Sequence, residues 1–208
     1  MENPKEKVSY CIGYETGKNL RTQFSDISVE LLLEGFRDAV SESTPRLAEK
    51  EIISILTTLR QQIEVQQKQY IAQISEKNKK DGETFLQFNK QKEGIEVLPS
   101  GLQYRVIKKG KGGGRPTLFD TVGIHYKGNF IDGQVFDSSY ERNQPQILPV
   151  NRVIPGWSEA LQLMEPGDCW QLFIPHYLAY GEHGYGPQIG PNTTLLFEVE
   201  LLEINPKQ

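Results

Sequence analysis

The residues best suited to chemistry lie in one stretch, from Val122 to Ser139 (VGIHYKGNFIDGQVFDSS), and in two shorter ones, VIPGW at 153–157 and AYG at 179–181. These stretches contain no nucleophile beside a base, and the three histidines of the chain have no metal-ligand spacing. What they supply is a set of aromatic side chains with a single acid. Such a site binds and desolvates a peptide but is poorly equipped for hydrolysis or redox chemistry. The candidate site residues are Tyr126, Phe136, Asp137, Trp157 and Tyr180.

Short strands must position these side chains. Alternating apolar residues predict strands at 102–108, 122–126, 135–137, 169–174 and 194–204. Asp132-Gly133 between two of them is typical of a hairpin turn. The one helix candidate, 155–164, is ended by Pro166-Gly167. The second half therefore predicts an α+β domain, with an antiparallel sheet wrapped on one short helix.

The first half is expected to be all-α. Apolar residues recur at steps of three and four from Val29 to Val40, after a cap at Asp26 or Ser28. Thr44-Pro45 indicates the start of a second, long helix over about 45–92, in which Gly82 is the only glycine and a candidate bend. If unbroken, that helix is about 65–70 Å long. Glycine and proline become frequent near residue 95, which predicts domains at 1–93 and 94–208.

The helical region carries only a thin apolar stripe, which makes a poor core for a monomer. We therefore expect a homodimer through residues 1–75, with the long helix as a strut. The alternative is a small monomeric bundle folded back on itself.

Composition and net charge limit the possible partners and locations of the protein. The net charge of −4 argues against nucleic acid. No run approaches the roughly 20 apolar residues that span a bilayer, and the first residues lack the apolar core of a secretory signal. We expect a cytoplasmic protein; the alternative is a periplasmic or secreted one whose signal was removed. Cys11 and Cys169 fit no disulfide framework, and we expect both as buried free thiols.

Five motifs in order, VGIHYKG, DGQVFDSS, VIPGW, LAYG and TTLLFEVELLEI, cover roughly the last 110 residues. This part of the chain resembles the FKBP-type peptidyl-prolyl cis-trans isomerases. The first half, with YCIGYETGKNL and LLLEGFRDAV, is similar to the Mip-like and FklB-like bacterial subgroup, in which N-terminal helices form a dimer. The resemblance implies isomerisation of Xaa-Pro bonds in proline-containing peptides and unfolded proteins, without metal or cofactor.

The resemblance also implies roles in the site. Trp157 would form the floor under the proline ring, the backbone N–H of Ile154 and the hydroxyl of Tyr180 would hold substrate carbonyls, and Asp137 would lie near the reacting amide, paired with Tyr126 and Arg142. Tyr185 and Ile189 would belong to a loop over the pocket. The remaining wall residues would be Phe136, Leu148, Val153 and Phe197.

One departure concerns the pocket rim, where this chain has Gln146, Ile147 and Leu148 while many family members have an aromatic residue. We expect activity with an altered preference for the residue before proline. The same site makes macrolide inhibitors such as rapamycin candidate ligands. Two alternative hypotheses stay open: a chaperone-like dimer that uses the pocket for docking, and a secreted virulence factor.

Overall fold

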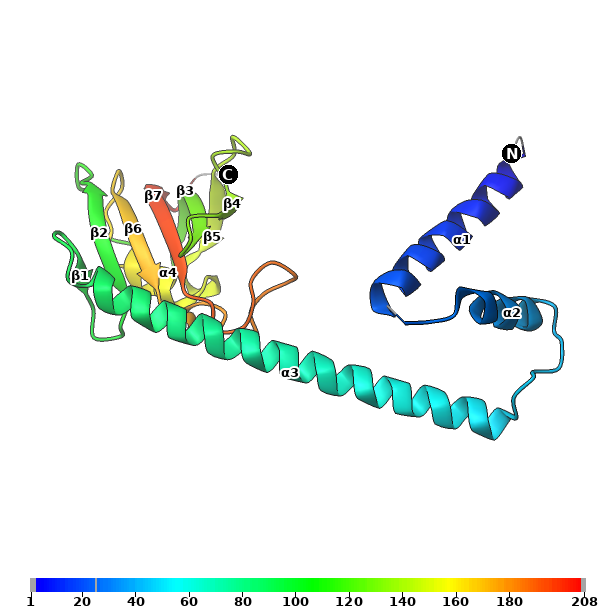
Figure 1. The fold of residues 1–208 in the computed structure, drawn as a ribbon. Coiled ribbons are helices and arrows are strands. Elements are labelled where there is room, and N and C mark those ends of the chain that lie inside the picture. The colour runs from blue at the N-terminus through cyan, green and yellow to red at the C-terminus, as the bar shows by residue number, and fades with distance from the viewer. Residues whose placement is uncertain (1–2, 25, 207–208) are drawn as a thin grey trace. The chain divides into compact units, whose positions relative to one another are not determined.

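The computed structural model describes residues 3–24 and 26–206, which divide into two compact units, Met1–Ile63 and Glu64–Gln208. We call them the N-terminal unit and the C-terminal unit. The first contains only helices, and the second joins half of a long helix to a β-sheet domain (Figure 1). No helix among the described residues is both long and apolar enough to cross a bilayer. The predicted boundary between residues 93 and 94 stays a prediction.

The N-terminal unit begins with α1 (Pro4–Gln23), where the side chain of Asn3 accepts a hydrogen bond from the N–H of Lys5 and proline occupies the first turn. Helix α2 (Val29–Val40) has the predicted bounds, and of the two candidate caps it uses Ser28, whose side chain accepts from the N–H of Leu31. None of its residues is buried.

Helix α3 (Glu49–Asn89) starts later than Thr44-Pro45 predicts. Arg46 pairs instead with α2: its Nε lies 3.1 Å from Oδ2 of Asp38, and a second ion pair joins it to Glu34. These ion pairs accompany a non-helical connection between α2 and α3. The helix runs on through Gly82, which the sequence presents as a candidate bend.

In the C-terminal unit, one antiparallel sheet has the order β1-β2-β6-β7-β3-β4, and β5 pairs with β3 beside β4. Strands β2 (Gln103–Lys108), β3 (Thr121–Phe130), β4 (Val135–Ser138), β6 (Cys169–Ile174) and β7 (Leu195–Ile204) fall where the alternation predicts them. Two short strands, β1 (Glu96–Val97) and β5 (Gln146–Pro149), were not predicted. The α+β prediction is confirmed.

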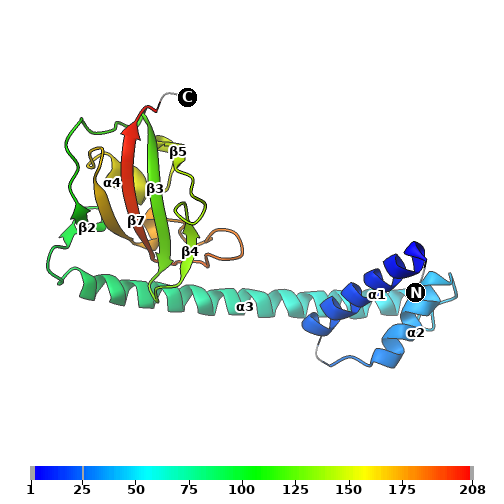
Figure 2. The ribbon, with the colours of Figure 1, turned by 90° about the horizontal axis from the view of Figure 1, so that it is seen from above.

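The sheet curves around α4 (Pro155–Leu161), as Figures 1 and 2 show. Its core contains fully buried Leu161, Leu172, Ile174 and Leu201. The 3-10 helices Val150–Arg152 and His176–Leu178 connect the elements. Cys169 is buried in β6 as predicted, whereas Cys11 is exposed, so that prediction is wrong for Cys11.

Candidate active site

A pocket of about 500 Å³ opens between α4, β3, β4, β5, β7 and the loop after residue 179. We call it the aromatic pocket. Every predicted site residue except Ile189 lines it. Its lining is Tyr126, Phe136, Asp137, Gln146, Leu148, Arg152, Val153, Ile154, Trp157, Tyr180, Tyr185 and Phe197.

Strand pairing brings the aromatic side chains together. Strand β3 lies between β7 on one edge and β4 and β5 on the other, with Gly128 opposite both Asp137 and Phe197. A Cβ at Gly128 would lie 2.6 Å from Phe136 and 2.8 Å from Phe197. Glycine at this position therefore allows the two rings to meet across the strand.

The rings pack edge to face. Trp157 lies in the first turn of α4, with its ring centroid 5.0 Å from those of both Tyr126 and Phe197, at 69° and 82°. Phe136 meets Phe197 at 5.5 Å and 87°. Such T-shaped arrangements are favourable for aromatic quadrupoles and fix the walls relative to the Trp157 ring. Packed aromatic rings therefore form much of the pocket wall.

Three polar side chains, those of Tyr126, Asp137 and Arg142, are joined to one another at one edge of the pocket. The Tyr126 hydroxyl donates to Oδ2 of Asp137 at 2.5 Å, and Arg142 forms an ion pair with Oδ1 of Asp137 while its Nη2 donates to the Tyr126 hydroxyl at 2.9 Å. Burial alone would raise the pKa of Asp137, but the hydrogen bonds from Tyr126 and Arg142 outweigh it, and the pKa lies below its ordinary value. Burial and the bond to Asp137 raise the pKa of Tyr126. At neutral pH the edge therefore holds a carboxylate and a protonated phenol.

The loop after residue 179 contributes two further tyrosines to the pocket. The rings of Tyr180 and Tyr185 stack with centroids 4.8 Å apart at 21°. Burial raises the pKa of Tyr180, which keeps its hydroxyl a potential donor. Ile189 is buried in the core, and its backbone exchanges two hydrogen bonds with Tyr185. Its place in the loop supports Tyr185 without lining the pocket.

Arg152 lines the pocket and was not predicted. The only sequence signal for it is a cation directly before the apolar VIPGW motif. Gln146 also lines the pocket, and β5 pairs it with Ile124 of β3. No cluster of three or more His, Cys, Asp or Glu side chains with metal-binding geometry occurs among the described residues.

Two protein-family models match the sequence of this chain. A family model described as FKBP-type peptidyl-prolyl cis-trans isomerase matches residues 112–202. A second, described as the domain amino terminal to FKBP-type peptidyl-prolyl isomerase, matches residues 5–106.

Similar whole proteins are also known. The outer membrane protein MIP of Legionella longbeachae is 42% identical over 204 residues, which cover 98% of this chain and 87% of that protein. The FKBP-type 22 kDa peptidyl-prolyl cis-trans isomerase of Escherichia coli (strain K12) is 41% identical over 199 residues, or 95% and 94% of the two chains. The crystal structure of FkpA from Escherichia coli matches with a TM-score of 0.76 at 32% identity over 99% of both chains.

Proposed function

The chain belongs to the FKBP-type peptidyl-prolyl cis-trans isomerases, and we propose that its aromatic pocket is where the Xaa-Pro bond rotates. It is therefore an enzyme that interconverts cis and trans peptide bonds before proline. The observation that supports this site is the convergence of aromatic rings from β3, β4, α4 and β7 beside one ion-paired acid.

The reaction that such a pocket must accelerate is the rotation about a single peptide bond. Rotation about the Xaa-Pro bond has a barrier of about 20 kcal/mol, because amide resonance is lost on twisting. The planar amide has partial negative charge on its oxygen, whereas the amide twisted by 90° is less polar. A dry aromatic site therefore favours the twisted state over the planar one, which lowers the barrier by differential binding. No nucleophile or base is needed.

We assign the roles as follows. The proline ring packs on Trp157, which is only 6% exposed and so offers a largely desolvated surface. The N–H of Ile154, at the start of α4, and the hydroxyl of Tyr180 donate to substrate carbonyls on either side of the proline. The carboxylate of Asp137 lies near the rotating amide and is held by Tyr126. Phe136, Leu148, Val153, Tyr185 and Phe197 exclude water.

A protease-free isomerisation assay on a short Xaa-Pro peptide tests this site. Asp137→Leu and Tyr126→Ala should each lower kcat/KM about tenfold or more, because each removes the polar edge that faces the amide. Phe119→Ala removes an aromatic ring that is 92% exposed outside the pocket and should leave the rate unchanged. Wild-type activity in both pocket variants would refute the assignment.

The apolar residues of α2 support a homodimer through the N-terminal helices. Leu33, Phe36 and Val40 lie on one face of α2 and are 57%, 62% and 69% exposed, although a helix with one apolar face normally buries it. A second copy of the same helices would bury these side chains. Sedimentation equilibrium of the full chain tests this, and a monomer at micromolar concentration would contradict it.

The same exposed residues favour a second candidate function, the holding of unfolded clients. If the N-terminal unit binds clients, Tyr126→Ala should suppress the aggregation of an unfolded protein as well as the wild type does, although its isomerase activity is reduced. Loss of suppression together with activity would place client binding in the aromatic pocket instead.

The prediction of a cytoplasmic location finds no support among the relatives. We propose the alternative, a periplasmic or secreted location, because a relative 42% identical to this chain is named an outer membrane protein. Fractionation of cells that produce the protein from its own gene tests this proposal. Recovery in the cytoplasmic fraction alone would overturn it.

A further inference from the structure

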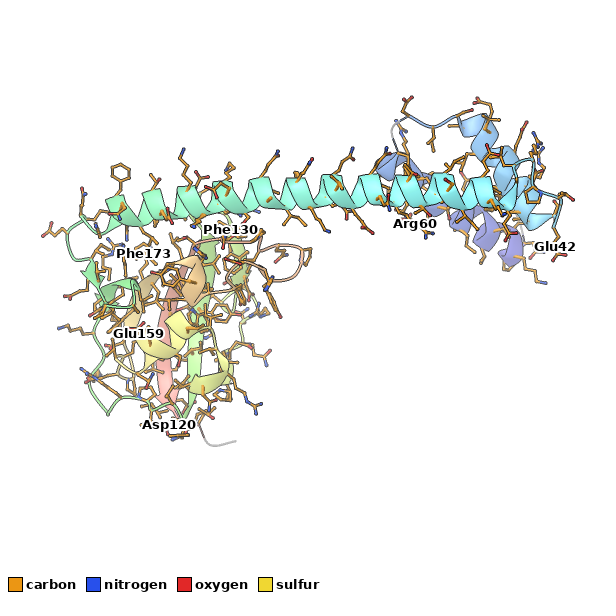
Figure 3. All side chains as sticks on the ribbon, turned by 90° about the horizontal axis from the view of Figure 1, so that it is seen from below. Glu42, Arg60, Asp120, Phe130, Glu159 and Phe173 are labelled. Atoms are coloured by element: carbon orange, nitrogen blue, oxygen red, sulfur yellow. The ribbon has the colours of Figure 1, made fainter. Side chains whose placement is uncertain are left out.

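One face of α3 lies on the sheet domain within the C-terminal unit. Its residues Ser75, Asn78, Gly82, Phe85 and Asn89 follow one another at steps of three and four, the spacing of a single helix face. A Cβ at Gly82 would lie 2.2 Å from the Thr194 hydroxyl, which shows how closely the helix approaches. Phe85 packs on Phe173 with ring centroids 6.1 Å apart, and Figure 3 shows Phe173 on the side of the domain next to α3.

Two polar residues of this face bind a single segment, 190–193. Nδ2 of Asn78 donates to the carbonyl of Pro191 at 2.9 Å and to the hydroxyl of Thr193 at 3.3 Å. Nδ2 of Asn192 donates to the hydroxyl of Ser75 at 2.7 Å. A Cβ at Gly190 would lie 3.2 Å from Nδ2 of Asn78, so the segment fits closely against the helix.

The segment is the second stem of the loop that carries Tyr185. The N–H of Asn192 donates to the carbonyl of Gly181 at 2.8 Å and closes the base of the loop. Within the loop, the N–H of Tyr185 donates to Ile189 at 2.8 Å and the N–H of Ile189 donates back at 3.2 Å. Figures 1 and 2 both place this loop beside α3. A continuous set of contacts therefore leads from α3 to the Tyr185 ring at the aromatic pocket.

We infer that Ser75 and Asn78 are positioning residues for the isomerase reaction. They hold the loop so that Tyr185 stacks on Tyr180 and forms a wall against the peptide residues that flank the proline. The loop needs such an anchor, because Gly184 and Gly186 have positive φ angles of 68° and 56° and glycine leaves the backbone free to adopt other conformations. The inference rests on the proposed function, since it acts through a residue of the proposed site.

A double-mutant cycle in the full-length protein tests the coupling. Asn78→Ala should lower kcat/KM for a short Xaa-Pro peptide about three- to tenfold, mainly through a higher KM, because the freed loop must be ordered again on binding. In a Tyr185→Ala background the same change should lower kcat/KM less than about 1.5-fold, because the residue through which Asn78 acts is gone. Gln73→Ala removes an exposed amide from the preceding turn of the helix, and it should leave kcat/KM unchanged in each background, equal to the wild type in one and to Tyr185→Ala in the other.

Ser75→Ala removes only the bond from Asn192 and provides a second, milder cycle if Asn78→Ala fails to fold. Equal losses of kcat/KM in both backgrounds, or no loss from either α3 variant, would overturn the inference. If Tyr185→Ala itself retains full kcat/KM and KM, the inference also fails. None of these results refutes the proposed function, which fails only if Asp137→Leu and Tyr126→Ala both retain wild-type activity.

Discussion

The N-terminal unit exposes its apolar side chains, whereas the C-terminal unit buries many of them. No described residue of the first unit with an assigned burial is buried, and Leu31 and Val40 of α2 are 67% and 69% exposed. In the second unit, Leu172, Ile174 and Leu201 are completely buried. The periodic pattern that predicts burial is present in both. The pattern therefore shows which face of an element is apolar, but not whether the same chain covers that face.

The largest effect should follow a core truncation in the C-terminal unit. Leu172→Ala leaves a cavity at a fully buried position and should cost about 2–5 kcal/mol of the free energy of unfolding. Leu33→Ala in α2, at a position 57% exposed, should cost less than about 0.5 kcal/mol in the monomeric protein. Urea unfolding followed at Trp157 and Trp170 measures the first change. Urea unfolding followed by far-UV circular dichroism in a Phe36→Glu background, chosen to keep the chain monomeric, measures the second. Equal costs would contradict the difference between the units.

A charge on α2 should affect dimerisation without affecting the activity of the C-terminal unit. If α2 forms the proposed homodimer interface, Phe36→Glu, at a position 62% exposed in the single chain, should weaken the dimer about a hundredfold, because it would bury a carboxylate in that interface. Sedimentation velocity measures this change. Activity on a short peptide should stay unchanged, since the aromatic pocket lies wholly within the C-terminal unit. A parallel loss of peptide activity would show that the pocket depends on the dimer.

The reaction rates of the two cysteines should show the same difference in burial between the units. Cys11 is exposed, whereas burial raises the pKa of Cys169 to about 11. In the Phe36→Glu variant at pH 8, Cys11 should react with a disulfide reagent at least about tenfold faster than Cys169. The thiolate is the reactive form, and the raised pKa of Cys169 leaves little of it as thiolate. Unfolding in urea should make the two rates similar. Equal rates in the folded protein would contradict the burial of Cys169.

The smallest effect concerns pH. Because its folded-state pKa is depressed, Asp137 stabilises the fold above its unfolded pKa and loses that contribution only as the pH falls through the lowered value. Between pH 8 and pH 5 its carboxylate therefore stays ionised, and kcat/KM should change less than about twofold. The peptide assay across that range measures this, with Asp137→Asn as the control without a titrating group. A steep wild-type loss above pH 5 would reveal another titrating group at the pocket.

The sequence predicts most of the sheet because its strands alternate and a short turn joins β3 to β4. It does not predict β5, whose four residues QILP end in proline and gain their pairing only from the neighbouring β3. The start of α3 is also misplaced, since the cap signal at Thr44-Pro45 lies in a connection where Arg46 pairs with α2.

The candidate site was predicted through motif order, because single aromatic residues are more often core than pocket. What the sequence could not show is the contact of α3 with segment 190–193, on which the proposed support of the site depends. Ser75, Asn78 and Gly82 are small or polar, so a search for apolar periodicity passes over them, although they occupy the contact face of the helix. Their role depends on partners more than a hundred residues away in the chain.

The edges of the sheet have a further consequence. One edge is divided between β1, which has two residues, and the part of β2 that β1 does not pair with, and the other is divided between β4 and β5, which have four each. An enzyme that works on unfolded chains constantly meets extended segments with unpaired backbone groups. Long, straight sheet edges would recruit such segments as extra strands and start mixed aggregates. Short, divided edges would give such segments little to pair with, so an unfolded client of the kind proposed for this protein would find few places to add a strand.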